Sequence, residues 1–450
     1  MPGASLSRWT MSYFAAACLF LLAGEGLLAA GYGNPVAGIS GGDVLAVVHL
    51  ITAGWLGLLM SGALLQFVPV LAAKPLRAGR LALPSLVAIL AGEVGLVSGF
   101  ALLASGVTLS DHLLACGGIL LATGFLGVAT MVLRTFFDAR PLPLAGRFVA
   151  LSIVGLVGTV CLGVFMALGL SSLLPGDLLA LVSDMLPVHA AFGLGGWLTL
   201  SALGVSYKLL PMFLLAGEPE GRRPNLVFLG GASVLTLLLL LVLLTFRGNS
   251  AVFTAALACF VAAVSLILYG FDLLAIVRTR RRRDMELNSL ASLAAFAWLF
   301  VAFVWLVVAS LSGRIGDHVE AIIYLAGFGW LSGLGLAQLY KIVPFLTWLE
   351  CYGPVLGRVP TPRVQDIVRE RRARMWFVAF HAGVAVATLA LSLGIAFLFR
   401  VGVFLQFCAT FALVIEFLRA RRLVDVAPGL RLPKGTMRPY LFLPSPDLRR

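Results

Sequence analysis

Apolar runs of about 20 residues or more recur along almost the whole chain, separated by short polar connections. A run of this length is sufficient to cross the hydrocarbon core of a bilayer as a helix. The pattern predicts an all-α integral membrane protein with no soluble domain between its spans. Twelve spans are expected, at 11–31, 44–72, 81–105, 110–133, 148–171, 184–215, 225–246, 251–277, 289–311, 318–349, 375–399 and 401–423.

Three of these spans share a pattern in which a Trp is followed by a small residue seven positions later and by a Pro after seven more. The copies are Trp55-Gly62-Pro69, Trp197-Gly204-Pro211 and Trp330-Ala337-Pro344, in the second, sixth and tenth spans. Steps of seven keep these residues near one helix face, and we expect each proline to end its helix. The period predicts three pseudo-threefold repeats of four helices, at about 1–140, 141–283 and 284–423. Helix packing through small-residue notches is the alternative explanation.

Basic residues are distributed unequally about these spans. Of the 33 Lys and Arg residues, 30 fall on one side, and the exceptions are Arg247, Arg314 and Arg400. The positive-inside rule therefore predicts cytoplasmic N- and C-termini for a multi-pass protein of a bacterial inner membrane. The net charge of +13 follows from this asymmetry. It does not indicate a nucleic-acid partner, because no basic face is interleaved with exposed aromatic residues.

The remaining segments and the cysteines add little chemistry. We interpret 424–450 as a basic, Pro-rich cytoplasmic tail that is extended or disordered. In the long connection at 350–374, the Arg-rich half is a candidate surface helix. The six cysteines include no CxxC pair, so neither a disulfide framework nor a Cys-based metal site is expected. Glu25 interrupts the first apolar run, which favours a retained span over a cleaved signal peptide.

Histidines provide the main chemical signal, because there are only five. We place His49, His112, His189 and His318 near the outer ends of even-numbered spans and His381 near a cytoplasmic end. His49 and His189 lie on repeated spans, 20 and 22 residues before Pro69 and Pro211. Imidazole is the commonest metal ligand, and ionisable residues at membrane depth are often functional. The alternative is that each histidine only hydrogen-bonds across a helix interface.

Glu93 is the other costly residue, near the middle of the third span with no basic residue at its depth. A buried carboxyl group can relay protons or bind a cation. A neutral Glu93 hydrogen-bonded across the bundle is the alternative. In that case Gln should replace it better than Leu, because Leu would leave its partner unsatisfied.

Twelve spans in three arcs of four, with cytoplasmic termini and histidines on the repeated spans, resemble subunit I of the haem–copper oxidases. The same plan occurs in the related NnrS-like membrane proteins, which are not oxidases. The segments His-Ala-Ala-Phe-Gly from His189 and Tyr-Lys-Ile-Val-Pro-Phe-Leu from Tyr340 are more similar to an uncharacterised non-oxidase branch. The resemblance covers nearly the whole chain. It implies that His49 matches a haem-ligand position and that His189 approximately matches a copper-ligand position.

The chain also departs from the oxidase pattern. Ile322 and Tyr324 stand where the tenth oxidase helix would carry its histidine pair, and the seventh span (225–246) has no histidine. We therefore do not expect the chain alone to reduce dioxygen. One haem, such as haem b, or one transition metal could still bind in the outer half of the membrane through His49. For a haem, the candidate partner ligands are His189, His318 and Tyr324. For a single metal ion, the candidate partner ligand is His189.

Three functions remain open. The first is a haem- or metal-binding protein in electron transfer, gas response or respiratory assembly, working with membrane or redox partner subunits. The second is an ion- or proton-coupled transporter that uses Glu93. The third is a cofactor-free membrane scaffold. A threefold repeat favours the first or the third, because transporters more often have two related halves.

Overall fold

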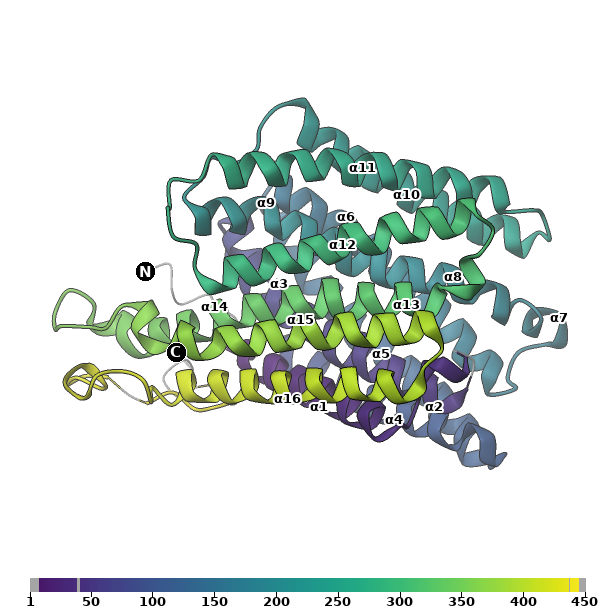
Figure 1. Cartoon of the computed structure of the whole chain (residues 1–450), viewed down its shortest axis with the longest axis horizontal. Helices are drawn as coiled ribbons and strands as arrows, with labels where there is room; N and C mark the ends of the chain where they lie inside the picture. Colours follow the sequence, from purple (N-terminus) through teal and green to yellow (C-terminus); the bar gives the residue numbers. More distant parts are fainter. Residues whose placement is uncertain (1–7, 39–40, 437, 445–450) are drawn as a thin grey trace. The chain divides into compact units, whose positions relative to one another are not determined.

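The computed structural model of this chain describes residues 8–38, 41–436 and 438–444, and within these ranges it contains helices and no strand (Figure 1). In this described part of the chain, twelve helical segments are long and apolar enough to cross a membrane, as predicted. They are Thr10–Ala30, Gly42–Ala72, Gly79–Ser105, Thr108–Phe137, Leu144–Leu170, Val182–Leu214, Arg222–Phe246, Val252–Arg278, Leu287–Leu311, Val319–Val355, Glu370–Leu393 and Ala396–Arg421.

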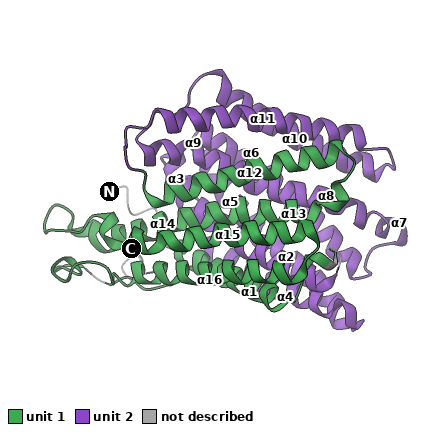
Figure 2. Ribbon diagram, viewed as in Figure 1, with its two compact units in different colours: residues 1–39, 285–450 green, residues 40–284 purple. Residues whose placement is uncertain are grey.

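The chain divides into two compact units (Figure 2). Unit 1 combines residues 1–39 with residues 285–450, and unit 2 comprises residues 40–284. The α-helices of unit 1 are α1 (Thr10–Ala30), α12 (Leu287–Leu311), α13 (Val319–Tyr324), α14 (Gly333–Tyr352), α15 (Glu370–Leu393) and α16 (Ala396–Arg421). Those of unit 2 are α2 (Gly42–His49), α3 (Leu58–Ala72), α4 (Ala82–Leu102), α5 (Thr108–Phe137), α6 (Leu144–Leu170), α8 (Val182–Ala190), α9 (Leu200–Leu214), α10 (Arg222–Phe246) and α11 (Val252–Arg278), with a single turn, α7 (Gly176–Leu179).

Glycines allow neighbouring helices in each unit to approach closely. A Cβ on Gly92 of α4 would lie 2.5 Å from the backbone nitrogen of Leu121 in α5. In unit 1, a Cβ on Gly383 of α15 would lie 2.7 Å from the backbone oxygen of Gly402 in α16. These helix pairs lie side by side (Figure 1). Small residues have this role in membrane helices, where lipid provides little hydrophobic drive for association.

Large apolar side chains also point out of the bundle along several spans. On α11, Phe253, Phe260 and Ile267 follow one another at steps of seven and are 79%, 64% and 59% exposed. A stripe of this kind fits the hydrocarbon of a lipid bilayer and is unusual on a water-facing surface. This stripe therefore indicates that the chain contacts lipid.

Two predicted span boundaries are wrong. We expected spans at 375–399 and 401–423, with Arg400 in the connection between them. Instead α15 ends at Leu393 and Gly394 has φ 67°, a left-handed conformation that suits glycine after a helix. Arg400 lies inside α16, where its Nε donates to the backbone oxygen of Ala29 at 3.1 Å. Backbone conformation, and not charge, sets this boundary.

The repeated prolines end their helices in only two of three copies. Helices α3 and α9 stop three residues after Pro69 and Pro211. Helix α14 instead continues for eight residues beyond Pro344, to Tyr352. Its last turn packs into a buried apolar cluster, which gives the extra turns a reason to form. The cluster contains Cys351, Tyr352, Ile367, Ala420, Leu423 and Val426.

Two expectations about segments outside the spans also need correction. The Arg-rich segment after residue 368 forms no separate surface helix, because α15 already begins at Glu370. The tail beyond residue 424 is not wholly extended or disordered in its described part. It forms a short 3-10 helix, η11 (Pro428–Leu430), and the backbone oxygen of Tyr440 accepts a 2.9 Å hydrogen bond from Arg421.

Candidate functional site

A π-helical segment interrupts each of the three repeated helices. The segments are η3 (Leu50–Gly57), η6 (Ala191–Thr199) and η8 (Leu325–Ser332), and each contains the repeated Trp. His49 is the last residue before η3, His189 lies two residues before η6, and Tyr324 is the last residue before η8. Short π-helical segments inside α-helices frequently mark functional sites. Three of the candidate ligands therefore lie at the entrance to a π segment.

Segments η3 and η6 contact each other within unit 2. Phe125 of α5 packs beside both of them. Its ring centroid lies 5.1 Å from that of Trp197 in an edge-on arrangement, and a Cβ on Gly57 would meet its ring at 2.7 Å. Trp55 is fully buried and Trp197 is 4% exposed. This packing gives the helices that carry His49 and His189 a fixed relation to each other.

His49 is oriented by its own helix. Its Nδ1 lies 2.8 Å from the backbone oxygen of Leu45, and its ring lies 4.9 Å from that of Phe100. Because a carbonyl oxygen can only accept, Nδ1 carries the proton of the neutral imidazole. The Nε2 lone pair then remains available, and no described residue hydrogen-bonds to it. Metal-ligating histidines are usually held in this way.

His189 is oriented by a neighbouring helix. Its Nδ1 lies 3.1 Å from the backbone oxygen of Thr159 in α6, which again leaves Nε2 with the lone pair. A Cβ on Gly163 would lie 3.2 Å from the imidazole, so a glycine makes room for the ring. The segments that follow His49 and His189, η3 and η6, contact each other. The structure thus brings these two predicted ligands into one region of unit 2.

The other predicted ligands, His318 and Tyr324, lie in unit 1. His318 immediately precedes α13, and its ring lies 5.7 Å from that of Trp305. Its buried Nδ1 has no hydrogen-bond partner among the described residues. Tyr324 is 6% exposed and packs against Phe328 at 4.5 Å between ring centroids.

A buried polar network surrounds Tyr324. Its hydroxyl donates to Gln406 Oε1 at 2.9 Å, and Gln406 Nε2 donates to Glu25 Oε1 at 2.7 Å. Thr410 also donates to Glu25 Oε1, at 3.1 Å, whereas Glu25 Oε2 has no described partner. This network was not predicted from the sequence. Gln406 and Thr410 are one helical turn apart in an apolar span, which was the available signal.

Glu93 is fully buried on α4, so it faces protein. However, neither carboxyl oxygen has a hydrogen-bond partner among the described residues. The cross-helix hydrogen bond considered above is therefore missing. An unpartnered buried carboxyl group is costly.

His381 differs from its expected position. It lies eleven residues after the start of α15 and twelve before its end, in the middle of the helix instead of near a cytoplasmic end. Trp298 Nε1 donates to its Nδ1 at 3.2 Å, and its buried Nε2 has no partner among the described residues. A Cβ on Gly333, directly after η8, would lie 2.9 Å from this imidazole.

Within the described ranges, no group of three or more His, Cys, Asp or Glu side chains could hold a metal ion. A metal bound by protein alone usually needs three or four ligands. Haem iron needs only one or two from the protein. Two histidines with free Nε2 atoms therefore fit haem ligation better than a protein-only metal centre.

Comparison of the chain with protein-family models finds no match, and comparison with curated proteins finds none either.

Proposed function

We propose that this chain is an oxidase-like membrane protein that binds one haem through His49, in the outer half of a bacterial inner membrane. The observation that carries this proposal is the pair of histidines at the entrances to η3 and η6. Each has its Nδ1 tied to a backbone oxygen, at 2.8 Å for His49 and 3.1 Å for His189. This arrangement fixes the ring and leaves Nε2 free to act as a ligand.

The protein residues have distinct parts in this proposal. Leu45 and Thr159 provide the backbone oxygens that hold the imidazoles. Phe100 packs against the His49 ring, and Gly163 leaves space beside the His189 ring. A haem bound here would supply one-electron redox chemistry or gas binding at an open coordination position. Electron transfer, gas response or respiratory assembly with redox partner subunits are the roles that follow.

The incomplete ligand set argues against dioxygen reduction by this chain alone. The span corresponding to 225–246 is α10 (Arg222–Phe246), which carries no histidine. The family resemblance, the repeat of four helices and the cytoplasmic termini remain part of the proposal. Reporter fusions at the loop containing Arg281 and at Arg247 test the orientation, and reporters placing Arg281 outside the cell would contradict it.

An optical spectrum of the purified protein tests the haem proposal most directly. We expect a Soret band in wild type that is strongly reduced in His49→Ala. The control is His112→Ala, because His112 is an exposed residue near the start of α5. Equal haem content in wild type and His49→Ala would remove His49 as a ligand. A wild-type protein without haem or metal would favour the cofactor-free scaffold.

Replacement of His189 tests whether the haem iron has one or two protein ligands. If both imidazoles bind the iron, His189→Ala should change the spectrum and open a coordination position, so that carbon monoxide binds the reduced haem. If His49 alone binds, the His189→Ala spectrum should match that of wild type. Either result retains haem binding by His49 and distinguishes electron transfer from gas binding.

Glu93 supports a second candidate function, an ion- or proton-coupled transporter. Its carboxyl group is fully buried, neither oxygen has a partner among the described residues, and a group of this kind at membrane depth can carry a proton. Solute or ion uptake into proteoliposomes that is driven by a pH gradient should then disappear in Glu93→Gln. Gradient-driven uptake that is unchanged in this variant would contradict the transporter function.

A further inference from the structure

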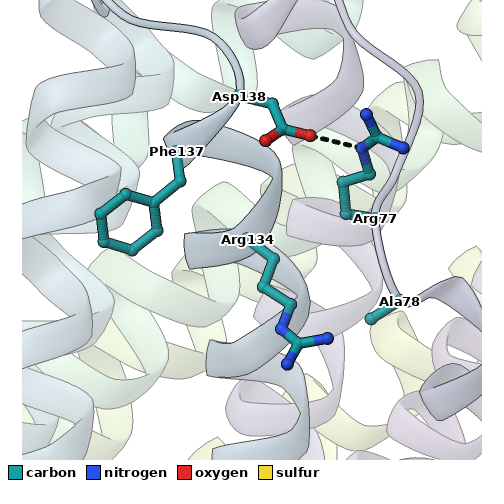
Figure 3. A pocket seen from close by; sticks show the side chains of 5 residues that line it. All are labelled: Arg77, Ala78, Arg134, Phe137 and Asp138. Atoms are coloured by element: carbon teal, nitrogen blue, oxygen red, sulfur yellow. Dashed lines mark hydrogen bonds and ion pairs between the residues drawn. The ribbon is translucent and has the colours of Figure 1, made fainter.

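A pocket of about 300 Å³ lies at one end of the predicted spans of unit 2 (Figure 3). Its lining consists of Arg77, Ala78, Arg134, Phe137 and Asp138. Phe137 is the last residue of the span Thr108–Phe137, so the pocket lies at a membrane boundary. The charge asymmetry predicts that this boundary is the cytoplasmic one.

The two arginines of the pocket differ in their partners. Arg77 Nε donates to Asp138 at 2.5 Å, and the backbone nitrogen of Arg77 donates to Thr135 of α5 at 2.9 Å. These two bonds fix Arg77 against α5. Arg134 forms no ion pair with any described acidic residue, although Asp138 directly follows the helix that carries it. The lining therefore carries one uncompensated positive charge, from two arginines and one aspartate.

The surroundings of the pocket suit a lipid–water boundary. The Phe137 side chain is 63% exposed, and the Arg140 guanidinium lies 4.8 Å from its ring centroid. An exposed apolar ring beside a charged guanidinium group is suited to the level where hydrocarbon meets headgroups. Lys74 lies on the short connection that carries Arg77, and Arg80 lies in the turn η4 (Gly79–Leu81) that follows it, so this end of the spans is rich in basic residues.

We propose that this pocket binds a phosphate ester anion, with Arg134 as its principal partner and Arg77 as the second. Guanidinium groups bind phosphate oxygens in a bidentate manner. An open volume of about 300 Å³ has room for more than one ordered water. The headgroup of an anionic phospholipid and a soluble phosphate ester share this chemistry, and the position at the membrane boundary favours the lipid.

Lipid binding to the full-length protein tests this proposal. The protein is purified in neutral detergent and titrated with phosphatidylglycerol or phosphatidylcholine, and bound lipid is counted by native mass spectrometry. We expect Arg134→Gln to weaken phosphatidylglycerol binding about fivefold, the effect of one basic side chain near an anionic surface. Binding of phosphatidylcholine should remain unchanged.

Arg283→Gln is the matched control, because Arg283 is an exposed basic residue outside the pocket. An equal loss in Arg283→Gln would indicate diffuse attraction and overturn the pocket site, as would undiminished binding in Arg134→Gln. Titration with glycerol 3-phosphate distinguishes the sources. If glycerol 3-phosphate binds and Arg134→Gln weakens that binding, the ligand is a soluble ester. If glycerol 3-phosphate does not bind but lipid binding depends on Arg134, the ligand is the lipid. Arg134→Lys keeps the charge but loses the planar fork, so an intermediate affinity would support bidentate binding.

Discussion

The Tyr324 hydroxyl donates a 2.9 Å hydrogen bond to Gln406 Oε1. Tyr324 lies 20 residues before Pro344, the same distance that separates His49 from Pro69. The two residues thus occupy equivalent places at the entrance to a π segment but have different partners. A hydroxyl that donates is a neutral phenol. Ligation of iron by an anionic Tyr324 would therefore break its bond to Gln406, whereas His49 can bind a metal without losing its bond to Leu45.

Glu25 should matter for stability through the groups that donate to it. Glu25→Leu would leave the Gln406 amide and the Thr410 hydroxyl without an acceptor in a buried site. We expect a loss of roughly 1–3 kcal/mol in unfolding free energy. Glu25→Gln keeps one carbonyl oxygen and should lose less. Unfolding of the purified variants in mild detergent measures the difference, and an equal effect of Leu and Gln would contradict the network.

Glu93 should respond in the opposite way. Neither of its oxygens has a described partner, so replacement by Leu would leave no neighbouring group unsatisfied. We expect Glu93→Leu to unfold no more easily than wild type, and Glu93→Gln to show no advantage over Leu. This reverses the order expected from a cross-helix hydrogen bond. If Glu93→Leu is less stable than Glu93→Gln, the Glu93 carboxyl group has a hydrogen-bond partner and this prediction is wrong.

The twelve spans could be predicted because apolar length is a local property of the sequence. The boundary between the last two spans could not, since Arg400 suggested a connection while Gly394 forms it. The π segments also escaped prediction. They arise from a change in backbone hydrogen-bond register, and no residue type in the repeat signals that change.

The candidate site was only partly accessible from the sequence for a related reason. His49 and His189 were found because histidine is rare and both precede a repeated proline. The contact of Glu25 with Gln406 joins residues 381 positions apart. Such a pairing depends on which helices of unit 1 pack together, and no local pattern in the sequence indicates that.

The close approach of α6 and η6 should make Gly155 intolerant of even a small side chain. A Cβ at this position would lie 2.3 Å from the carbonyl carbon of Gly196. Because backbone cannot yield as a flexible side chain does, we expect Gly155→Ala to cost roughly 1–3 kcal/mol of stability. Gly195→Ala is the control, since its Cβ would meet no atom within 4 Å. The midpoints of thermal unfolding of both variants measure this difference. Equal midpoints would contradict the close contact between Gly155 and Gly196.

Asp425 lies just after the last span, with a side chain that is only 3% exposed. Arg372 lies 2.6 Å and Arg419 3.0 Å from its carboxyl oxygens. Burial opposes ionisation, but the hydrogen bonds and charges of these arginines outweigh it and lower the pKa of Asp425 to about 2. A lowered pKa in the folded state means that ionised Asp425 stabilises the fold, and protonation removes this effect.

Asp425→Asn should therefore destabilise the protein at neutral pH by roughly 2 kcal/mol, the value of a shift from the ordinary Asp pKa. The difference from wild type should stay constant at neutral pH and shrink as the pH falls from about 4 towards the folded-state pKa of about 2. Denaturant unfolding at a series of pH values measures this difference. Asp317→Asn is the control, because its pair with Arg314 is 58% exposed on the aspartate side and should contribute little. A difference that persists undiminished down to the folded-state pKa would show that the charge of Asp425 is not what stabilises the fold.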